Sequence, residues 1–294
     1  MFKQILKSMP LAILASSFLI TGQAVSQEKP NVDIKIGVRS LFFEKYNKMM
    51  EGTNCVDFDK FDSPYAHRVT VELTLICKAL HLGDIKPNIE LISFEYTDRA
   101  NKEIAAGKLD MAAQSRWFSS IDPEKFHASQ AIVRNGEFKK GIFGLASNKA
   151  LFEVDSLEKL RKFEALSSKR WTVDWKTIKD LKLPVTDSTG QIPKMYQMVN
   201  KKRADYVLAE FRSTDSFHNE FDGITLTAVP NITLVLNASR HFIVSKKSPN
   251  EKVIFETLEK GIDILRSKGA IEKAYYQSGF YNEKVKDWKV INNT

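Results

Sequence analysis

Two stretches of the chain repeat one pattern of polar and apolar positions. Residues 107–113 and residues 202–209 each end a helix-like segment with a basic residue and an aspartate, and then enter a short apolar run. An apolar run of this length is typical of a buried parallel strand. A charge follows each run, Arg116 in the first copy and Glu210 in the second. Because ligands of open α/β sheets bind beyond the carboxyl ends of the strands, the repeat predicts two lobes that offer a cation and an anion to one solute.

The first repeat closes a longer unit that alternates strands and helices. Residues 34–39 alternate apolar and polar side chains, which favours a strand. Ser63-Pro64 is typical of a helix start, with serine as the cap and proline in the first turn. We expect strands at 34–39, 89–94 and 109–113, helices at 63–80 and 98–106, a loop at 40–43 and irregular chain at 44–62. This order predicts a parallel sheet with right-handed crossovers.

A second unit of the same kind follows, and further elements come after it. We expect its strands at 141–146, 170–174 and 206–209, and its helices at 155–160, 177–183 and 191–202. The rest of the chain predicts strands at 224–228, 234–236 and 241–245, and an amphipathic helix at 250–268. If these last elements return to the first unit, the fold has two lobes and two hinge crossings, near 129–138 and 225–232. The expected division is lobe I at 27–134 plus 228–294, and lobe II at 135–227.

The N-terminus has the pattern of a targeting segment. Lys3 and Lys7 precede an apolar run at 10–20, and small residues follow at Ala24 and Ser26. The run is shorter than a membrane span requires, so we expect residues 1–26 to be a signal peptide that is cut after Ser26. An uncleaved membrane anchor is the alternative. Either way, the pattern predicts export of the chain.

The net charge and its distribution along the chain argue against some classes of function and favour others. The net charge is +8, and it is +6 without residues 1–26, which hold two lysines and no acid. The excess is scattered and lacks a basic stripe with interleaved aromatics, so we do not expect nucleic-acid binding. A modest positive charge favours an anionic or zwitterionic solute, or a negative membrane face.

The two cysteines, Cys55 and Cys77, suggest one disulfide, because an even count in an exported chain usually forms a bridge. Two free buried thiols are the alternative. We expect no metal and no cofactor, because no phosphate-binding glycine loop is present and the histidines are dispersed, at 67, 81, 127, 218 and 241. We also find no set of residues that argues for catalysis.

Several short motifs, each weak alone, occur in an order that resembles a known family. The chain resembles bacterial periplasmic solute-binding proteins of the type II fold, in particular extracellular solute-binding protein family 3, over about 34–285. The motifs are Gly37-Val38-Arg39, the segment 94–100, Gly107-Lys108-Leu109-Asp110, the segments 129–132, 156–160 and 203–207, and the late helix 269–275. The resemblance implies a two-lobed α/β protein of the periplasm that captures a small solute and delivers it to an inner-membrane ABC permease. We expect a monomer.

The resemblance also implies roles for Arg116 and Glu210. An arginine of the first lobe would hold a ligand carboxylate through paired charge-assisted bonds, and an acid of the second lobe would hold the amino group. Arg116 could instead form a surface ion pair, and Glu210 could be a structural acid. The sequence departs from the family pattern after Asp110, where Gln114-Ser115-Arg116-Trp117 follows directly. The resemblance therefore does not name the solute.

Other candidate ligand-binding residues lie at the ends of predicted strands. Aromatic side chains there could wall the cleft or simply pack in the core, and the turn after residue 174 could present backbone N–H groups to an anion. The candidates are Trp117, Phe42, Phe43, Arg39, Trp175, Lys176 and Thr177. Two other functions remain open: a dehydratase-like enzyme on the same fold, with Glu210 as general acid, and a ligand sensor that feeds a membrane receptor.

Overall fold

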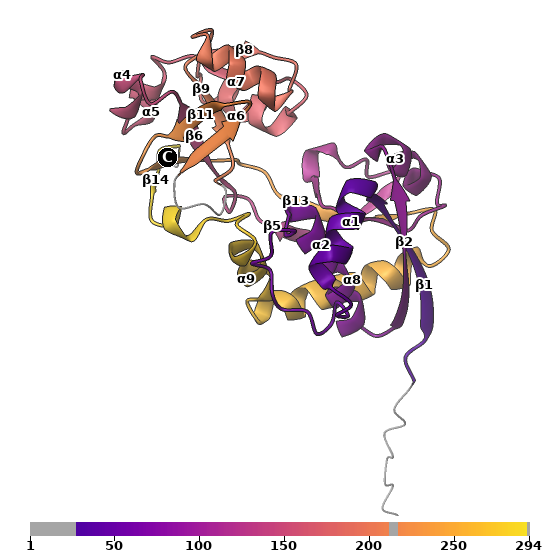
Figure 1. Cartoon of the computed structure of the whole chain (residues 1–294). Coiled ribbons are helices and arrows are strands. Elements are labelled where there is room, and N and C mark those ends of the chain that lie inside the picture. The colour runs from indigo at the N-terminus through magenta and orange to yellow at the C-terminus, as the bar shows by residue number, and fades with distance from the viewer. Residues whose placement is uncertain (1–27, 212–216, 293–294) are drawn as a thin grey trace, which may run out of the picture.

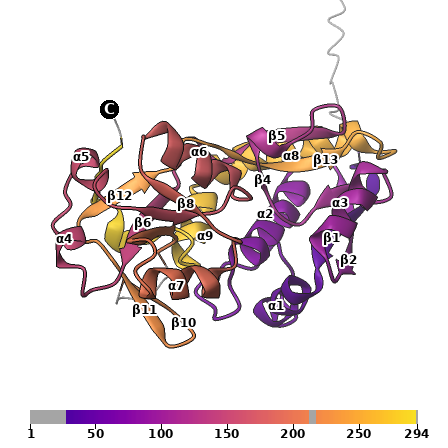
Figure 2. The same ribbon diagram turned by 90° about the horizontal axis from the view of Figure 1, so that it is seen from above.

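The protein has two lobes, each built on its own β-sheet and flanked by helices (Figure 1). The structure, a computed structural model, describes residues 28–211 and 217–292. Figure 2 shows the lobes side by side, with chain segments passing between them. The predicted two-lobed α/β fold is confirmed. The predicted signal peptide, residues 1–26, lies outside the described residues.

The first sheet forms the lobe that contains the N-terminal part of the described chain and the two α-helices near its C-terminal end. Its strand order is β2-β1-β3-β13-β4, and β5 pairs with β13. Strand β1 is parallel to β2 and β3, whereas β13 is antiparallel to β3, β4 and β5. The strands are β1 Asn31–Arg39, β2 Lys86–Phe94, β3 Met111–Ala112, β4 Arg116–Trp117, β5 Phe126–Val133 and β13 Arg240–Ser245. The helices are α1 Ser40–Met50, α2 Arg68–Leu82, α3 Thr97–Ala105, α8 Glu251–Ser267 and α9 Ala270–Gln277.

The second sheet forms the other lobe. Its order is β10-β11-β6-β9-β7-β8, and β12 joins β6 to β14. Strand β7 is parallel to β8 and β9, as expected for the second unit. Strand β6, also expected to be parallel, is instead antiparallel to β9, β11 and β12. The strands are β6 Lys139–Gly144, β7 Ala165–Ser167, β8 Val185–Asp187, β9 Tyr206–Ala209, β10 His218–Phe221, β11 Ile224–Ala228, β12 Ile232–Val235 and β14 Lys289–Val290. The helices are α4 Lys149–Phe152, α5 Leu157–Leu160, α6 Thr172–Asp180 and α7 Ile192–Asn200.

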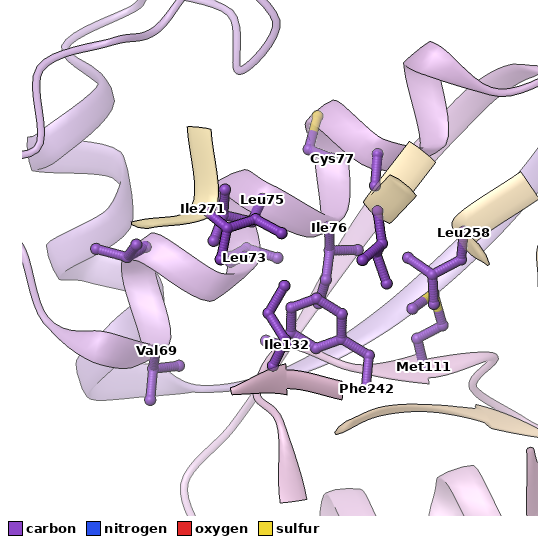
Figure 3. Packing of buried hydrophobic residues seen from close by; sticks show 14 of the residues in the cluster. Val69, Leu73, Leu75, Ile76, Cys77, Met111, Ile132, Phe242, Leu258 and Ile271 are labelled. Carbon is purple, nitrogen blue, oxygen red and sulfur yellow. The ribbon is translucent and has the colours of Figure 1, made fainter. Parts of the chain in front are cut away.

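Helix α2 is the centre of the first lobe's core. Its side chains are apolar on most of its circumference, so it is buried between the sheet and the late helices (Figure 3). Leu73 and Ile76 pack there with Phe242 of β13 and Leu258 of α8. Helix α8 approaches closely because Gly261 has no side chain: an added Cβ would lie 2.0 Å from the carbonyl oxygen of Ala79.

Predicted and observed elements differ most in three places, besides shifts of a few residues at the ends of others. Residues 40–50 form helix α1 and not a loop, because an apolar face at positions 42, 43, 46, 49 and 50 packs on the core. Helix α2 does not begin at Ser63-Pro64 but at Arg68, where Val69 N donates to His67 Nδ1 and His67 N donates to Thr70 Oγ1. The predicted strand 170–174 is wrong: the strand is β7, which pairs with β8 and β9, and α6 begins at Thr172.

Within residues 28–211 and 217–292, the chain passes between the lobes three times. The first passage joins β5 to β6 and lies within the expected range. The second joins β12 to β13, after Val235 and later than the expected 225–232, because β12 still pairs with β6. A third passage was not expected: after α9 the chain reaches the second sheet as β14, and Trp288 packs 5.5 Å from Phe211, centroid to centroid. Ala228, residues 232–235 and residues 289–290 thus belong to the second sheet.

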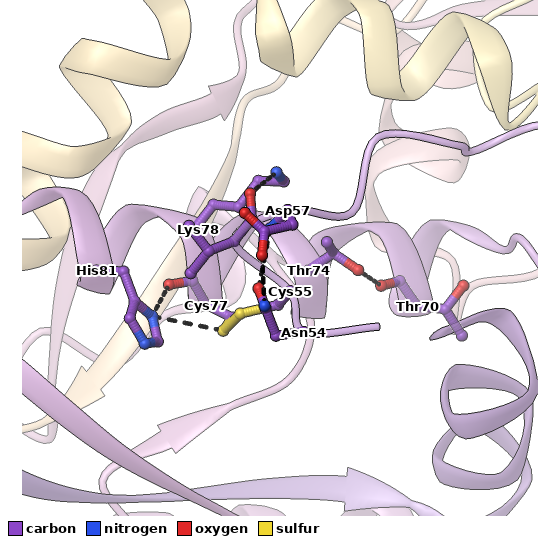
Figure 4. Close-up of a disulfide and its surroundings, with 9 residues drawn as sticks. Asn54, Cys55, Asp57, Thr70, Thr74, Cys77, Lys78 and His81 are labelled. Carbon is purple, nitrogen blue, oxygen red and sulfur yellow. Dashed lines mark hydrogen bonds between the residues drawn. A yellow bond between two sulfur atoms is a disulfide. The ribbon is translucent and has the colours of Figure 1, made fainter. Parts of the chain in front are cut away.

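The predicted disulfide is present. Cys55 is bonded to Cys77 of α2, with 6.1 Å between the Cα atoms (Figure 4). The bridge fastens the loop after α1 to the central helix, and the Lys78 ammonium adds a 2.7 Å bond to the carbonyl of Val56. Within the described ranges, no helix has the length and apolar character needed to cross a membrane.

Candidate functional site

A cavity of about 520 Å³ lies where the two lobes meet. Residues from both sheets and from the passages between them line it. The first lobe contributes Arg68, Trp117, Arg240 and Phe280. The passage into the second lobe and the second lobe itself contribute Phe138, Lys140, Arg170, Trp171, Thr172, Asp174, Ile192, Met195, Tyr196, Val207, Leu208, Ala209, Glu210, Asn219 and Phe221. The cavity therefore combines aromatic walls with charges of both signs, and its volume lies in the usual range for small-molecule sites.

The first-lobe wall is organised around one buried acid. Glu72 of α2 is fully buried, and its Oε2 accepts from Arg68 Nη1 at 2.8 Å and from Ser115 N at 2.8 Å. Its Oε1 accepts from Ser115 Oγ at 2.6 Å and from Tyr275 Oη at 3.3 Å. A carboxylate leaves water only where its lone pairs are satisfied. This network therefore fixes Arg68 at the start of α2, with its head partly exposed in the cavity.

Arg240 is the second cation of this wall. Its Nε donates to Ser115 Oγ at 2.9 Å, its Nη2 donates to Ser115 O at 2.7 Å, and its guanidinium lies 4.4 Å from the ring centroid of Trp117. Burial, and then repulsion from Arg68, lowers the pKa of Arg240 to about 10, so it stays charged at neutral pH. Arg240 forms no ion pair with any described residue. Two guanidiniums thus share the charge of Glu72, which leaves an excess of positive charge on this wall.

The second-lobe wall carries the opposing acid. Glu210 follows the last residue of β9, at the carboxyl end of the strand, and its side chain is exposed. Its charge acts across the cavity on both Arg68 and Arg240. Asn219 of β10 holds the backbone here by donating from Nδ2 to Glu210 O at 3.2 Å. Glu210 therefore faces the excess positive charge of the other lobe.

A second acid of this wall is already neutralised. Asp174 of α6 and Lys140 of β6 form an ion pair in which both side chains are about nine-tenths buried. A buried carboxylate bonded to an ammonium does not attract a further cation as strongly as a free one. Arg170 and Trp171 stand beside this pair at the start of α6 and complete the wall.

Two of the predicted ligand-binding residues, Trp117 and Glu210, line the cavity. Arg116 does not: its guanidinium donates to Asn101 Oδ1 and lies 5.1 Å from the ring centroid of Phe126, and burial lowers its pKa to about 10. Neighbouring side chains of a strand point to opposite faces. Since Trp117 faces the cavity from β4, Arg116 faces away from it.

The other predicted residues also lie away from the lining. Phe42 stacks on His67 at 4.6 Å, and Phe43 is partly buried against the core. Lys176 bonds Asp180 at 2.5 Å on the exposed side of α6, and the ammonium of Lys169 lies 5.6 Å from the ring of Trp175. The residues outside the lining are Arg39, Phe42, Phe43, Arg116, Trp175, Lys176 and Thr177.

Sequence reasoning missed Arg68, Arg240 and Arg170. One signal for Arg68 was available, because Glu72 is the single acid among the mostly apolar residues of α2 and lies four residues after Arg68. No comparable local signal marks Arg240. It reaches the site because β13 pairs with β4, and this pairing joins segments more than 120 residues apart.

Sequence reasoning also overlooked His81, four residues after Cys77. The His81 Nδ1 atom lies 3.6 Å from Cys77 Sγ, and the ligand atoms of Cys55, Cys77 and His81 lie within 4.8 Å of one another. The two sulfurs are bonded to each other, however, and metals bind cysteine as the free thiolate. His81 Nδ1 also lies 2.9 Å from the carbonyl oxygen of Cys77 (Figure 4).

Comparison with known proteins identifies the fold. No family model and no curated protein sequence matches the chain. The structure is similar to the probable amino-acid ABC transporter extracellular-binding protein YtmK of Bacillus subtilis, with 16% identity, a TM-score of 0.56, and coverage of 85% of this chain and 99% of that one. It is also similar to the L-cystine solute receptor of Neisseria gonorrhoeae in its unliganded open conformation, with 14% identity, a TM-score of 0.51, and coverage of 90% and 96%.

A third similar structure is the BvgS VFT2 domain of Bordetella pertussis, with 14% identity, a TM-score of 0.53, and coverage of 83% and 93%. Each of these proteins is matched over nearly its whole length. The chain therefore has the two-lobed, type II fold of solute-binding proteins, as its sequence motifs predict.

Proposed function

We propose that this protein binds a small anionic or zwitterionic, amino-acid-like solute in the cavity between its lobes. The type II fold supports a solute-binding role, because similar structures include proteins named as an amino-acid ABC transporter binding protein and an L-cystine receptor. The cavity has the volume of a small-molecule site, and it lies at the junction where movement of one lobe against the other would enclose a ligand.

The opposition of charges across the cavity carries this proposal. Arg68 and Arg240 share the single carboxylate of Glu72, so the first wall has one positive charge to spare. A ligand carboxylate placed there would accept charge-assisted bonds from guanidinium N–H groups that Glu72 and Ser115 do not use. Glu210 on the facing wall would hold an ammonium. The ring of Trp117, with Arg240 stacked on it, supplies an apolar floor.

The proposed biological role is capture of the solute in the periplasm and its delivery to an inner-membrane ABC permease. The N-terminal pattern of Lys3, Lys7 and an apolar run supports export. If ligand binding closes the two lobes, the loaded protein has a different shape from the empty one, and the permease can recognise the loaded protein by that shape.

A thermal-shift screen of the mature protein against amino acids, organic acids and short peptides tests the proposal. A ligand that binds only the folded state raises the unfolding temperature. We expect hits that carry a carboxylate. The absence of any hit would overturn the proposal. Chemical conversion of a hit, detected by mass spectrometry, would show that the protein is an enzyme and not a binding protein.

Variants then test the residues. We expect Arg240→Gln and Glu210→Gln to weaken a zwitterionic hit by about tenfold or more, since a charge-assisted bond contributes roughly 1.5–3 kcal/mol. The matched control is Arg116→Gln, because Arg116 lies outside the cavity lining. Loss of binding in Arg116→Gln, with unchanged binding in Arg240→Gln, would refute the assignment of the carboxylate to Arg240. The folding of each variant without ligand is first checked by circular dichroism.

A further inference from the structure

A second hollow, of about 790 Å³, lies entirely within the second lobe. It is bounded by the carboxyl ends of β7 and β8, by the start of α6 and by one side of α7. Of the residues that the structure describes, only Arg170 lines both this hollow and the cavity between the lobes. We call it the lobe II hollow. Because one lobe supplies every lining residue, a ligand here would not depend on movement between the lobes.

The lobe II hollow is strongly basic. Among its described lining residues, five are cations and one is an acid: Lys169, Arg170, Lys194, Lys201, Arg203 and Asp187. Lys169 lies 3.5 Å from Asp187 and its charge is thereby balanced. Among the described residues, the other four cations have no acidic partner within ion-pair distance. Four unbalanced positive charges therefore surround one concave surface.

Like charges held around a concavity raise the local positive potential, and this potential attracts anions of high valence most strongly. The hydroxyls of Ser188 and Thr189 add neutral hydrogen-bonding groups to the same rim. The hollow is much larger than a single monatomic ion requires, and a concave site suits a small molecule better than the flat contact surface of a macromolecule.

We propose that the lobe II hollow binds a soluble multivalent anion, of the polyphosphate or polycarboxylate class. The anion is held by Arg170, Lys194, Lys201 and Arg203, and it occupies a site separate from the cavity between the lobes. This site does not rest on the proposed function, because it uses neither Arg240 nor Glu210.

Isothermal titration calorimetry at low salt, with pyrophosphate, citrate and acetate as probes, tests this site. We expect at least one of the two multivalent probes to bind well above acetate, and its affinity to fall as salt is added. The variant Lys194→Gln/Arg203→Gln removes two of the cations, and we expect it to lower that affinity by about fivefold or more. The matched control, Lys149→Gln/Lys162→Gln, removes the same charge from exposed positions of lobe II that do not line the hollow.

Three results would overturn the inference. If neither multivalent probe binds more tightly than acetate, the proposed anion site is refuted. An equal loss in the site variant and in the control would show a general effect of net charge. A comparable loss in Arg240→Gln would place the anion in the cavity between the lobes. Retained binding in Arg240→Gln, together with loss in Lys194→Gln/Arg203→Gln, supports the separate site.

Discussion

Replacing Glu72 by glutamine removes the negative charge at the centre of the first-lobe wall while keeping the shape of the side chain. Glu72 accepts three close bonds, at 2.8 Å from Arg68 and at 2.8 and 2.6 Å from the two donors of Ser115. A hydrogen bond to a charged group contributes about 1 kcal/mol more than a neutral one. The amide nitrogen of glutamine cannot accept, so the change weakens the bonds to the oxygen that remains and loses the acceptor at the other position. Together these effects cost about 3 kcal/mol. We therefore expect Glu72→Gln to lower the free energy of unfolding by about 2–3 kcal/mol at pH 7, since Arg68 retains some exposure to water.

The pH dependence of this loss has a definite sign. Burial by itself would raise the pKa of Glu72, but Arg68, Arg240 and the Ser115 donors outweigh it and hold the pKa below its ordinary value of 4.5. A carboxyl whose pKa is lower in the folded state stabilises the protein above the unfolded pKa, and this stabilisation is lost as the pH falls through the folded pKa. The difference between wild type and Glu72→Gln should therefore be full at neutral pH and shrink below pH 4.5.

Urea unfolding of both proteins, at pH 7 and at steps into the acid range, measures this difference. The matched control is Glu256→Gln, which removes an exposed acid that lies 3.9 Å from Lys252 and should change stability by less than about 0.5 kcal/mol. A loss below about 1 kcal/mol in Glu72→Gln at pH 7 would refute the reasoning. So would a loss that stays constant into the acid range, because a purely steric cause would not titrate.

Two further perturbations test the packing of the first lobe. Replacing both Cys55 and Cys77 by serine should lower the free energy of unfolding by about 3 kcal/mol, because it frees a loop with a sequence separation of 22; two free thiols in the unfolded, unreduced wild type would contradict the bridge. Gly261→Ala should cost about 1–3 kcal/mol despite the better helix propensity of alanine, since its Cβ would meet the Ala79 backbone at 2.0 Å. Glu256→Ala on the same helix is the control for Gly261→Ala, and equal stability of these two variants in urea would count against the close approach.

Local patterns were sufficient for most of the fold. Alternation and apolar runs located β1, β9 and β11, and the first βαβ unit followed from the order of the elements, because these signals depend on neighbours within a few residues. The parallel arrangement predicted for the second unit is wrong for β6, which is antiparallel to β9. The errors came where a local signal competed with a tertiary contact. Ser63-Pro64 has the composition of a helix start, yet the paired bonds of His67 and Thr70 place the start of α2 at Arg68.

The candidate site was predicted only in part for the same reason. Glu210 lies at the end of a parallel strand, and the general rule for such strands located it from sequence. Arg116 has the right chemistry at nearly the right position, but strand alternation turns it away and brings Trp117 to the cavity. The cation beside Trp117 is Arg240, which comes from a distant strand.

The sequence by itself determined the two α/β units, the pattern of an exported chain, the single disulfide and the acid at the end of β9. Each of these depends on composition or on short-range periodicity, which a linear chain displays directly. The tertiary structure alone decided which cations face that acid and how the lobes are joined a third time through β14. These features depend on pairings between residues far apart in the chain, and such pairings are selected by burial of the whole core, so that no local segment contains them.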